Sequence, residues 1–395
     1  MLLCFTAPVH GQATLPDGAG KEIVQASCAQ CHSLAQVTRA GYDRAGWSNV
    51  VAMMRNAGAQ VPPDKVDLVV DYLTKNFPPK AAPAAVVVPG SVHVTFQEWV
   101  VPQPGERPHD PLAAPDGSIW YTGQMANVLG RLDPKTGTFK EYRAKVADSG
   151  PHGLVMDGDG NVWFTANFAA YIGKLDPRSG TFTEYKLDPA ARDPHTLLFD
   201  HDGMLFFTVQ GADMIGRLNP KTREVKLAQV PTPHANPYGM VISSKNVPYF
   251  AEFGSNKIAS IDPRTLAIHE YALPNAAARP RRIAIDGEDV IWYSDYARGY
   301  LGRFDPKTGD VTEWASPGGA RSQPYGIAYL KNAVWYSESG VQPNTLVRFD
   351  PATQKFQTWP IPSGGGVVRN MMPTRDGNLA LACSGVNRVA LAIVK

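Results

Sequence analysis

The chain has 395 residues, of which 44% are hydrophobic and 19% charged, and its formal net charge is +2. This composition is ordinary for a soluble globular protein, and the length allows two domains or one large one. A charge so close to zero gives no reason to expect nucleic acid or an anionic membrane as a partner. No apolar run reaches the roughly 18 residues that a membrane-spanning helix needs.

Residues 1–13 are typical of the end of a secretory signal peptide. The stretch Met1–Ala7 is mainly apolar, and small residues follow at Gly11 and Ala13, as at a cleavage site. No basic segment precedes the apolar one, which leaves the translation start open. We interpret residues 1–13 as a signal-peptide remnant and expect an exported, periplasmic protein.

The run Cys28-Ala29-Gln30-Cys31-His32 has the C-x-x-C-H form that attaches c-type haem. Thiols at this spacing form thioethers with the haem vinyl groups, and the next imidazole ligates the iron. A thioredoxin-like motif would need a βαβ context, and a structural zinc site would need two more ligands nearby; the sequence shows neither. We therefore expect one covalent haem c, bound by Cys28 and Cys31 with His32 as an axial ligand to the iron.

Residues 14–77 are predicted to form a small all-α domain. Trp47, Val50, Val51 and Met54 share one helical face, whereas Met53 points away. A second helix is predicted from an Asp64 cap to Phe77. The spacing C-x-x-C-H, W-x6-M-x3-G-A and Y-L resembles small single-haem cytochrome c domains, which implies Met54 as the second axial ligand. A methionine on an apolar face is more often a core residue, so that alternative stays open.

Residues 78–93 are rich in Ala and Pro and show no periodicity, so we predict a semi-rigid linker there. Beyond it, aromatic residues repeat every 43 positions at Trp99, Tyr142 and Tyr185. A second marker repeats at the same spacing, at Trp120, Trp163, Phe206, Tyr249, Trp292 and Trp335. A period in the forties with short β segments and Gly/Asp turns is typical of a β-propeller with four strands per blade.

Seven inner strands are predicted over residues 94–395. They begin near His109, His152, His195, Tyr238, Arg281, Tyr325 and Arg369. The last blade has only three strands of its own, and residues 94–101 form an extra strand before the first blade. We expect these two pieces to pair and close the ring, which removes exposed strand edges. The predicted fold class is thus two domains, a small all-α cytochrome c domain (14–77) followed by an all-β seven-bladed β-propeller (94–395).

The repeated segments P-H-G, W-F-T-E, I-G-(K/R) and E-Y resemble those of the streptogramin B lyases, also called virginiamycin B lyases, over residues 94–395. The resemblance implies a seven-bladed propeller that opens a cyclic depsipeptide by magnesium-assisted elimination. Such a reaction needs a base for the proton next to the ester carbonyl and a cation for the enolate. The family places a histidine at the start of an inner strand and a glutamate after the second strand, mainly in its final two blades.

This sequence departs from the family pattern, because no blade contains both groups. His109, His152 and His195 are followed by the amides Gln124, Asn167 and Gln210, which are poor magnesium ligands. Glu252, Asp295 and Glu338 follow inner strands that begin with tyrosine or arginine instead. We expect the three histidines and three carboxylates to surround one mouth of the central channel as substrate-binding residues. His195 and Glu252 are the candidates for a composite catalytic pair, and a repeat-encoded structural role is the alternative.

Three functions remain open from the sequence. The first is an exported cytochrome that transfers electrons while its propeller binds a small-molecule substrate or a redox partner protein. The second is a magnesium-dependent carbon–oxygen lyase with an accessory haem. The third is a propeller without catalytic activity that serves as a docking platform. We favour the first from the sequence, because the haem motif is intact and the lyase motif is not.

Overall fold

The computed structural model describes residues 14–395, so the predicted signal-peptide remnant at 1–13 lies outside the described residues. Contacts divide the described residues into two units, with the boundary between Ala81 and Ala82. The first contains α1 (Lys21–Cys28), α2 (Ala35–Arg39), α3 (Arg44–Asn56) and α4 (Val66–Asn76). No helix within residues 14–395 is both long and apolar enough to cross a membrane.

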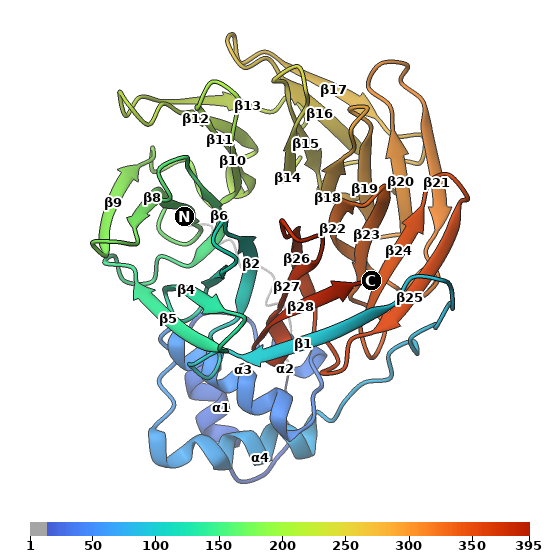
Figure 1. The fold of residues 1–395 in the computed structure, drawn as a ribbon. Coiled ribbons are helices and arrows are strands. Elements are labelled where there is room, and N and C mark those ends of the chain that lie inside the picture. The colour runs from blue at the N-terminus through green and yellow to red at the C-terminus, as the bar shows by residue number, and fades with distance from the viewer. Residues whose placement is uncertain (1–13) are drawn as a thin grey trace, which may run out of the picture. The chain divides into compact units, whose positions relative to one another are not determined.

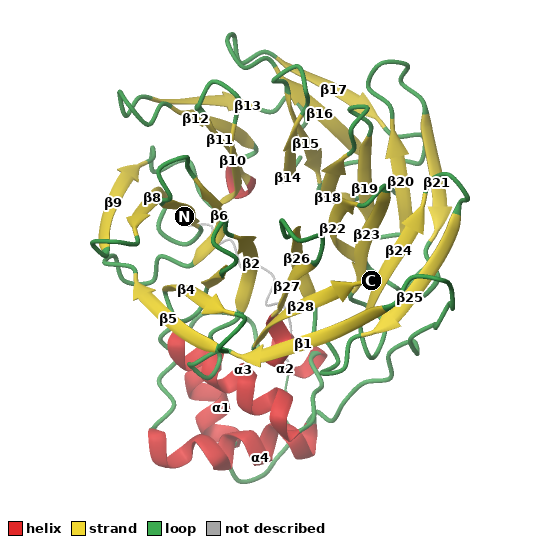
Figure 2. Cartoon of the chain, viewed as in Figure 1, coloured by secondary structure: helices red, strands yellow, loops and turns green. Residues whose placement is uncertain are grey.

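The second unit is a ring of seven four-stranded antiparallel sheets (Figures 1 and 2). Blade one contains β2 (Pro108–Ala113), β3 (Ile119–Gly123), β4 (Val128–Asp133) and β5 (Thr138–Arg143). Blade two contains β6 (Pro151–Met156), β7 (Val162–Ala166), β8 (Tyr171–Asp176) and β9 (Thr181–Lys186). Blade three contains β10 (Pro194–Phe199), β11 (Leu205–Val209), β12 (Met214–Leu218) and β13 (Val225–Gln229). Blade four contains β14 (Pro237–Ile242), β15 (Pro248–Glu252), β16 (Lys257–Ile261) and β17 (Ile268–Ala272).

The remaining three blades complete the ring. Blade five contains β18 (Pro280–Ile285), β19 (Ile291–Asp295), β20 (Tyr300–Phe304) and β21 (Val311–Ala315). Blade six contains β22 (Pro324–Leu330), β23 (Ala333–Glu338), β24 (Thr345–Asp350) and β25 (Lys355–Pro360). Blade seven contains β26 (Val368–Pro373), β27 (Leu379–Cys383) and β28 (Arg388–Val394), with β1 (Val94–Val100) as its outer strand.

The ring closes as predicted. Strand β1 pairs antiparallel with β28 in a continuous register from Val94 opposite Val394 to Val100 opposite Arg388. The first strand of the propeller thus completes the last sheet, and blade seven acquires its fourth strand. Residues before β1 also lie against blade six, where Thr358 donates from its hydroxyl to the carbonyl of Val86 and its backbone bonds to Val88.

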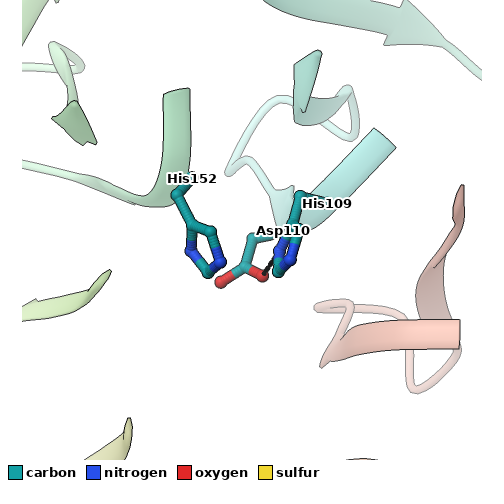
Figure 3. Close-up of side chains that lie close together, drawn as sticks. All are labelled: His109, Asp110 and His152. Atoms are coloured by element: carbon teal, nitrogen blue, oxygen red, sulfur yellow. Dashed lines mark hydrogen bonds and ion pairs between the residues drawn. The ribbon is translucent and has the colours of Figure 1, made fainter. Parts of the chain in front are cut away.

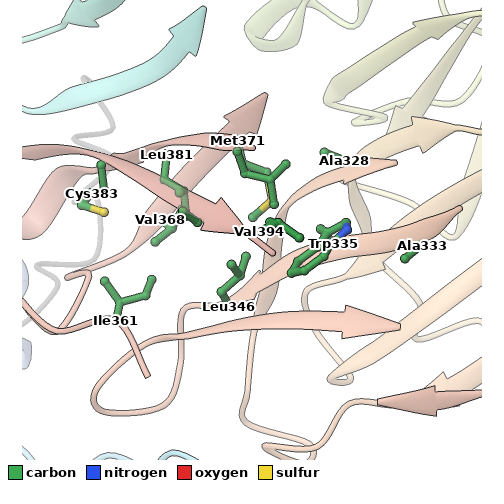
Figure 4. Packing of buried hydrophobic residues seen from close by; sticks show 13 residues of the cluster. Ala328, Ala333, Trp335, Leu346, Ile361, Val368, Met371, Leu381, Cys383 and Val394 are labelled. Carbon is green, nitrogen blue, oxygen red and sulfur yellow. The ribbon is translucent and has the colours of Figure 1, made fainter. Parts of the chain in front are cut away.

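The repeating aromatic residues hold each blade together internally. In four blades the two repeating positions stack on each other, with ring centroids 5.1–5.9 Å apart: Trp120 on Tyr142, Trp163 on Tyr185, Trp292 on Trp314 and Trp335 on Trp359. Between blades six and seven, Trp335, Leu346, Met371 and Leu381 belong to one buried apolar cluster (Figure 4). The 43-residue period therefore records core packing, as expected for a propeller.

The predicted fold class needs a correction in its first part. The structure is a seven-bladed propeller preceded by a short N-terminal helical stretch, and a separate all-α cytochrome c domain is not evident. Helical spacing correctly indicated α3 and α4, but it specifies helices and not the fold they belong to. The helices are only 5–13 residues long. Asp64 lies inside a 3-10 turn, Pro63–Lys65, and does not cap α4, which begins at Val66.

Candidate functional site

The second residue of each inner strand faces the propeller axis. These seven residues, called the axial ring below, are His109, His152, His195, Tyr238, Arg281, Tyr325 and Arg369. In every blade the register between the first two strands shifts just after the first residue, which places the ring residue in a β-bulge. A bulge changes the direction in which a side chain points. The predicted strand starts therefore meet in space, because all seven bulges lie at the same end of the strands.

In blades one, two, three, five and six, a hydroxyl in the second strand holds the bulge. Thr165 accepts from the backbone N–H of Gly153 in its own blade and donates to the carbonyl of His195 in the next blade. Thr122, Thr208 and Ser294 make the same pair of contacts in blades one, three and five. In blade six, Ser337 accepts from the N–H of Gly326 and donates to the carbonyl of Val368, the residue before Arg369. Gly153 is needed because a Cβ there would come within 2.5 Å of the His195 carbonyl oxygen. The residues at the positions of the P-H-G and W-F-T segments therefore hold the start of the inner strand and so position the residues of the axial ring.

Three histidines of the ring form a buried row. The ring centroids of His109 and His152 are 3.6 Å apart, and those of His152 and His195 are 3.7 Å apart. Tyr238 extends the row, 3.9 Å from His195. Each histidine is only 3% exposed. Figure 3 shows the His109 and His152 rings close together with the Asp110 carboxylate beside them.

The three histidines are held in the neutral form. Burial, together with the positive charges of Arg369 and Arg107, lowers the pKa of His109 well below its usual value. Burial and the neighbouring histidine likewise lower the pKa values of His152 and His195. His109 Nδ1 bonds to Asp110 Oδ1 and His195 Nδ1 to Thr196 Oγ1, whereas His152 Nδ1 is buried without a hydrogen-bond partner. A neutral imidazole without a partner is able to accept a proton.

The carboxylate at the axis is already neutralised by protein groups. Arg282 donates from Nη2 to Asp110 Oδ1 at 2.7 Å and from Nη1 to Oδ2 at 3.2 Å. Asn370 also donates to Asp110 Oδ2 at 3.1 Å. Both members of the ion pair are buried, so this two-bonded contact is little screened by solvent.

Arg281 lies in a cage of four aromatic rings. Its guanidinium carbon is 3.8 Å from the ring centroid of Tyr325, 4.4 Å from Tyr296, 4.7 Å from Phe253 and 5.0 Å from Tyr238. It donates one hydrogen bond, from Nη2 to the Tyr238 hydroxyl, and its buried Nε has no partner. Aromatic faces attract a guanidinium without neutralising it, so the positive charge stays available.

Two further arginines add positive charge that no carboxylate balances. Within residues 14–395, Arg107, Arg281 and Arg369 form no ion pair. Burial and the charges of Arg369 and Arg281 lower the pKa of Arg107 to about 9. Burial raises the pKa of Tyr325, but the charges of Arg281 and Arg369 outweigh that effect and leave it lowered. This end of the axis is therefore strongly positive.

The predicted carboxylates do not join the axial ring. Glu252, Asp295 and Glu338 are the last residues of their second strands, and each pairs in register with the proline that precedes a ring residue. Asp295 binds Arg298, and Glu338 accepts from Ser316, Thr345 and the N–H of Gly318. Glu252 accepts from Ser255, and its other oxygen is buried without a partner. Among the residues described, no hydrogen bond links Glu252 to His195.

The sequence interpretation missed the residues one position further along. Phe253 and Tyr296 follow Glu252 and Asp295 directly, and both are part of the cage around Arg281. They correspond to the amides Gln124, Asn167 and Gln210 in the first three blades. The sequence signal that could have identified them is a change of residue type at this repeat position, from an amide in the first three blades to an aromatic residue in blades four and five. Gln124 and Asn167 bond to each other, and Asn167 also bonds to Asp193.

A divalent cation does not fit this axis. His109, Asp110 and His152 have ligand atoms within 4.8 Å of one another. However, both Asp110 oxygens already accept bonds from Arg282 and Asn370, and magnesium prefers several oxygen ligands. The positive charges of the surrounding arginines also repel a divalent metal ion. We therefore derive no chemical step through a metal here.

The predicted haem residues lie in the N-terminal helical stretch. Cys28 ends α1 and is half-buried, and in the following turn Cys31 is exposed and His32 is half-buried. Both thiols are free. Met54 on α3 is half-buried, as is Met53, while Trp47 and Val51 on the predicted face are buried. Free, accessible thiols beside an accessible imidazole fit the donor set for haem attachment.

Comparison with known proteins places the propeller in a family context. The family model described as the virginiamycin B lyase family matches residues 87–348. A solved streptogramin B lyase is 26% identical with a TM-score of 0.70, and the match covers 76% of this chain and 98% of that one. A catalytically inactive variant of virginiamycin B lyase from Staphylococcus aureus, solved with quinupristin, is 22% identical with a TM-score of 0.69, covering 76% and 99%. Hydrazine synthase from Kuenenia stuttgartiensis is 12% identical with a TM-score of 0.61, covering 72% and 95%, and shares the fold alone. A search of curated proteins found no match.

Proposed function

Because the chain belongs to the virginiamycin B lyase family, we propose that its propeller is a carbon–oxygen lyase that works by elimination. The observation that carries the proposal is the buried row of neutral histidines beside arginines that no carboxylate balances. A neutral imidazole supplies the base, and a guanidinium supplies the positive charge that an enolate needs. This reverses our preference from the sequence, which favoured electron transfer.

The reaction uses only groups of this chain. An imidazole, with His152 as the first candidate, takes the proton from the carbon next to the carbonyl. The C–H electron pair forms the new double bond to the β carbon, and the β C–O bond breaks with its electron pair leaving on oxygen. The imidazolium then returns the proton to that oxygen. Arg281 stabilises the negative charge that develops on the carbonyl oxygen.

The test is an elimination assay with the full-length chain. A type B streptogramin and a set of β-acyloxy and β-alkoxy carboxylic acids are each incubated with magnesium or with a chelator. In the depsipeptide, ring opening by elimination leaves the mass unchanged and adds a conjugated double bond, whereas hydrolysis adds one water. We expect an unsaturated product with the chelator present, and His152→Ala to lower its rate by about 10² to 10⁴. Absence of unsaturated product from every substrate would overturn the proposal.

Covalent haem at Cys28 and Cys31 is a second, separate proposal, with His32 and Met54 as the iron ligands. The accessible free thiols and the adjacent imidazole support it. A bound haem supplies one-electron transfer, so transfer to a redox partner protein is the second candidate function. Thioether attachment outside the cytoplasm would agree with a periplasmic location. Magnesium dependence is not part of either proposal.

A further inference from the structure

We infer that the propeller axis binds a small organic carboxylate and that guanidinium groups replace the divalent cation of the related reaction. The inference names the substrate class of the proposed lyase site, so its catalytic part rests on the proposed function. Its binding part stands on the charges around the axis alone.

The first step is the count of charges. Arg107, Arg281, Arg282 and Arg369 supply four positive groups near the axis, and Asp110 is the one carboxylate that pairs with any of them in residues 14–395. The pKa of Arg107 is lowered to about 9 because burial and its arginine neighbours disfavour its charge. An anion placed among these groups would relieve that repulsion. The uncompensated positive charge of the free protein therefore favours binding of an anionic ligand.

The second step is hydrogen bonding. The Nε atoms of Arg281, Arg282 and Arg369 are all buried without a partner, and Arg281 donates only one N–H to a protein oxygen. Unpaired buried donors are costly, so their persistence at one place indicates a partner from outside the chain. Planar guanidiniums match a carboxylate, to which they donate two parallel bonds.

The third step separates this site from a structural charge cluster. Arg282 is buried and both of its Nη atoms donate to Asp110, whereas Arg281 and Arg369 are only partly buried and form no ion pair in residues 14–395. The rings of Tyr325, Tyr296 and Phe253 fix the Arg281 plane without using its charge. The histidine row lies on the other side of the same ring, where a base is needed if the carboxylate is held by the arginines. A substrate whose carboxylate is bonded to the carbon that loses the proton would contact both the arginines and the histidine row.

The experiment is calorimetric titration of the full-length chain with succinate, with its uncharged diamide and with inorganic phosphate, in a buffer free of divalent cations. We expect succinate to bind with one site, the diamide not to bind and phosphate to bind more weakly. Arg281→Gln and Arg369→Gln should each weaken succinate binding by about tenfold to a hundredfold. Arg264→Gln, an exposed arginine on the turn after β16, is the matched control and should bind like the wild type.

Variants that retain the positive charge distinguish a loss of binding from a loss of folding. Arg281→Lys and Arg369→Lys should bind succinate better than the glutamine variants, while circular dichroism shows the same β content in all. Equal binding of succinate and its diamide, tighter binding of phosphate, equal loss in Arg264→Gln, or no binding at all would each overturn the inference. Succinate binding without any elimination activity would leave the carboxylate site standing and remove the proposed lyase reaction.

Discussion

Arg282 in blade five forms a buried two-bonded ion pair with Asp110 in blade one, 172 residues earlier in the chain. The two blades are not neighbours in the ring, so the pair joins strands β2 and β18 across the propeller axis. Asn370 in blade seven binds the same carboxylate. One carboxylate thus connects three blades, which fixes the axial ring and occupies the oxygen atoms that a metal would need.

Replacing Arg282 by methionine tests this connection. The change leaves Asp110 buried without its charged partner, and such a loss costs about 3–5 kcal/mol in other proteins. We expect urea unfolding to report a loss in that range. The double variant Arg282→Met with Asp110→Asn removes both charges and should recover part of the stability. A single variant as stable as the wild type would show that the pair does not hold the ring.

The fold was largely predictable because propeller cores repeat along the chain. The stacked pair Trp163 and Tyr185 recurs with the 43-residue period, and the register of Val94 with Val394 follows from the incomplete last blade. The N-terminal stretch was less predictable. Apolar spacing in α3 and α4 indicates which face is buried, but it contains no information on how short helices are arranged.

The site was only half predictable. The sequence correctly indicated that inner strands begin near His109 and His152, because these positions repeat. It gave no sign that Arg282 would reach Asp110, because that contact crosses the axis between blades that are far apart in sequence. The aromatic cage was missed for the same reason: Phe253 comes from blade four, Tyr325 from blade six, and both contact an arginine of blade five.

The pH dependence of stability should report the neutral histidines. Burial lowers the pKa of folded His152, so below about pH 6.5 the unfolded chain binds a proton that the folded chain does not. The stability contribution is complete above that pH and is lost as the pH falls, by up to about 1.4 kcal/mol per pH unit for one group. Urea unfolding of His152→Asn should therefore show a shallower acid slope than the wild type. The exposed His269→Asn is the control, and an unchanged slope in His152→Asn would contradict the assignment.

Glu252 should destabilise the propeller when it is ionised. Burial raises its pKa to about 7, and one of its oxygens has no partner. Stability attributable to this group therefore falls as the pH rises from the unfolded value of about 4.3 through about 7. Glu252→Gln should be more stable than the wild type above neutral pH, and this advantage should shrink in acid.

Glu338→Gln provides the matched comparison for Glu252. Both oxygens of Glu338 accept bonds, from Ser316, Thr345 and a backbone N–H, and an amide cannot accept all of them. We expect this variant to lose stability where Glu252→Gln gains it. Elimination activity should survive in Glu252→Gln, and its loss there without loss of stability would restore Glu252 as a catalytic candidate.

The haem proposal predicts covalent attachment through Cys28 and Cys31. Protein produced with a haem c maturation system should retain haem after extraction with acidified acetone, because thioether bonds survive that treatment. Cys28→Ala should keep one thioether, and the double variant with Cys31→Ala should lose covalent haem entirely.

If Met54 is the second ligand, Met54→Ala abolishes the weak sulfur-to-iron absorption band and Met53→Ala does not. Both methionines are half-buried on α3, which makes the pair a matched control for general disturbance of the helix. Complete extraction of haem from the unaltered chain would overturn the proposal. Loss of the absorption band only in Met53→Ala would identify Met53 as the second axial ligand in place of Met54.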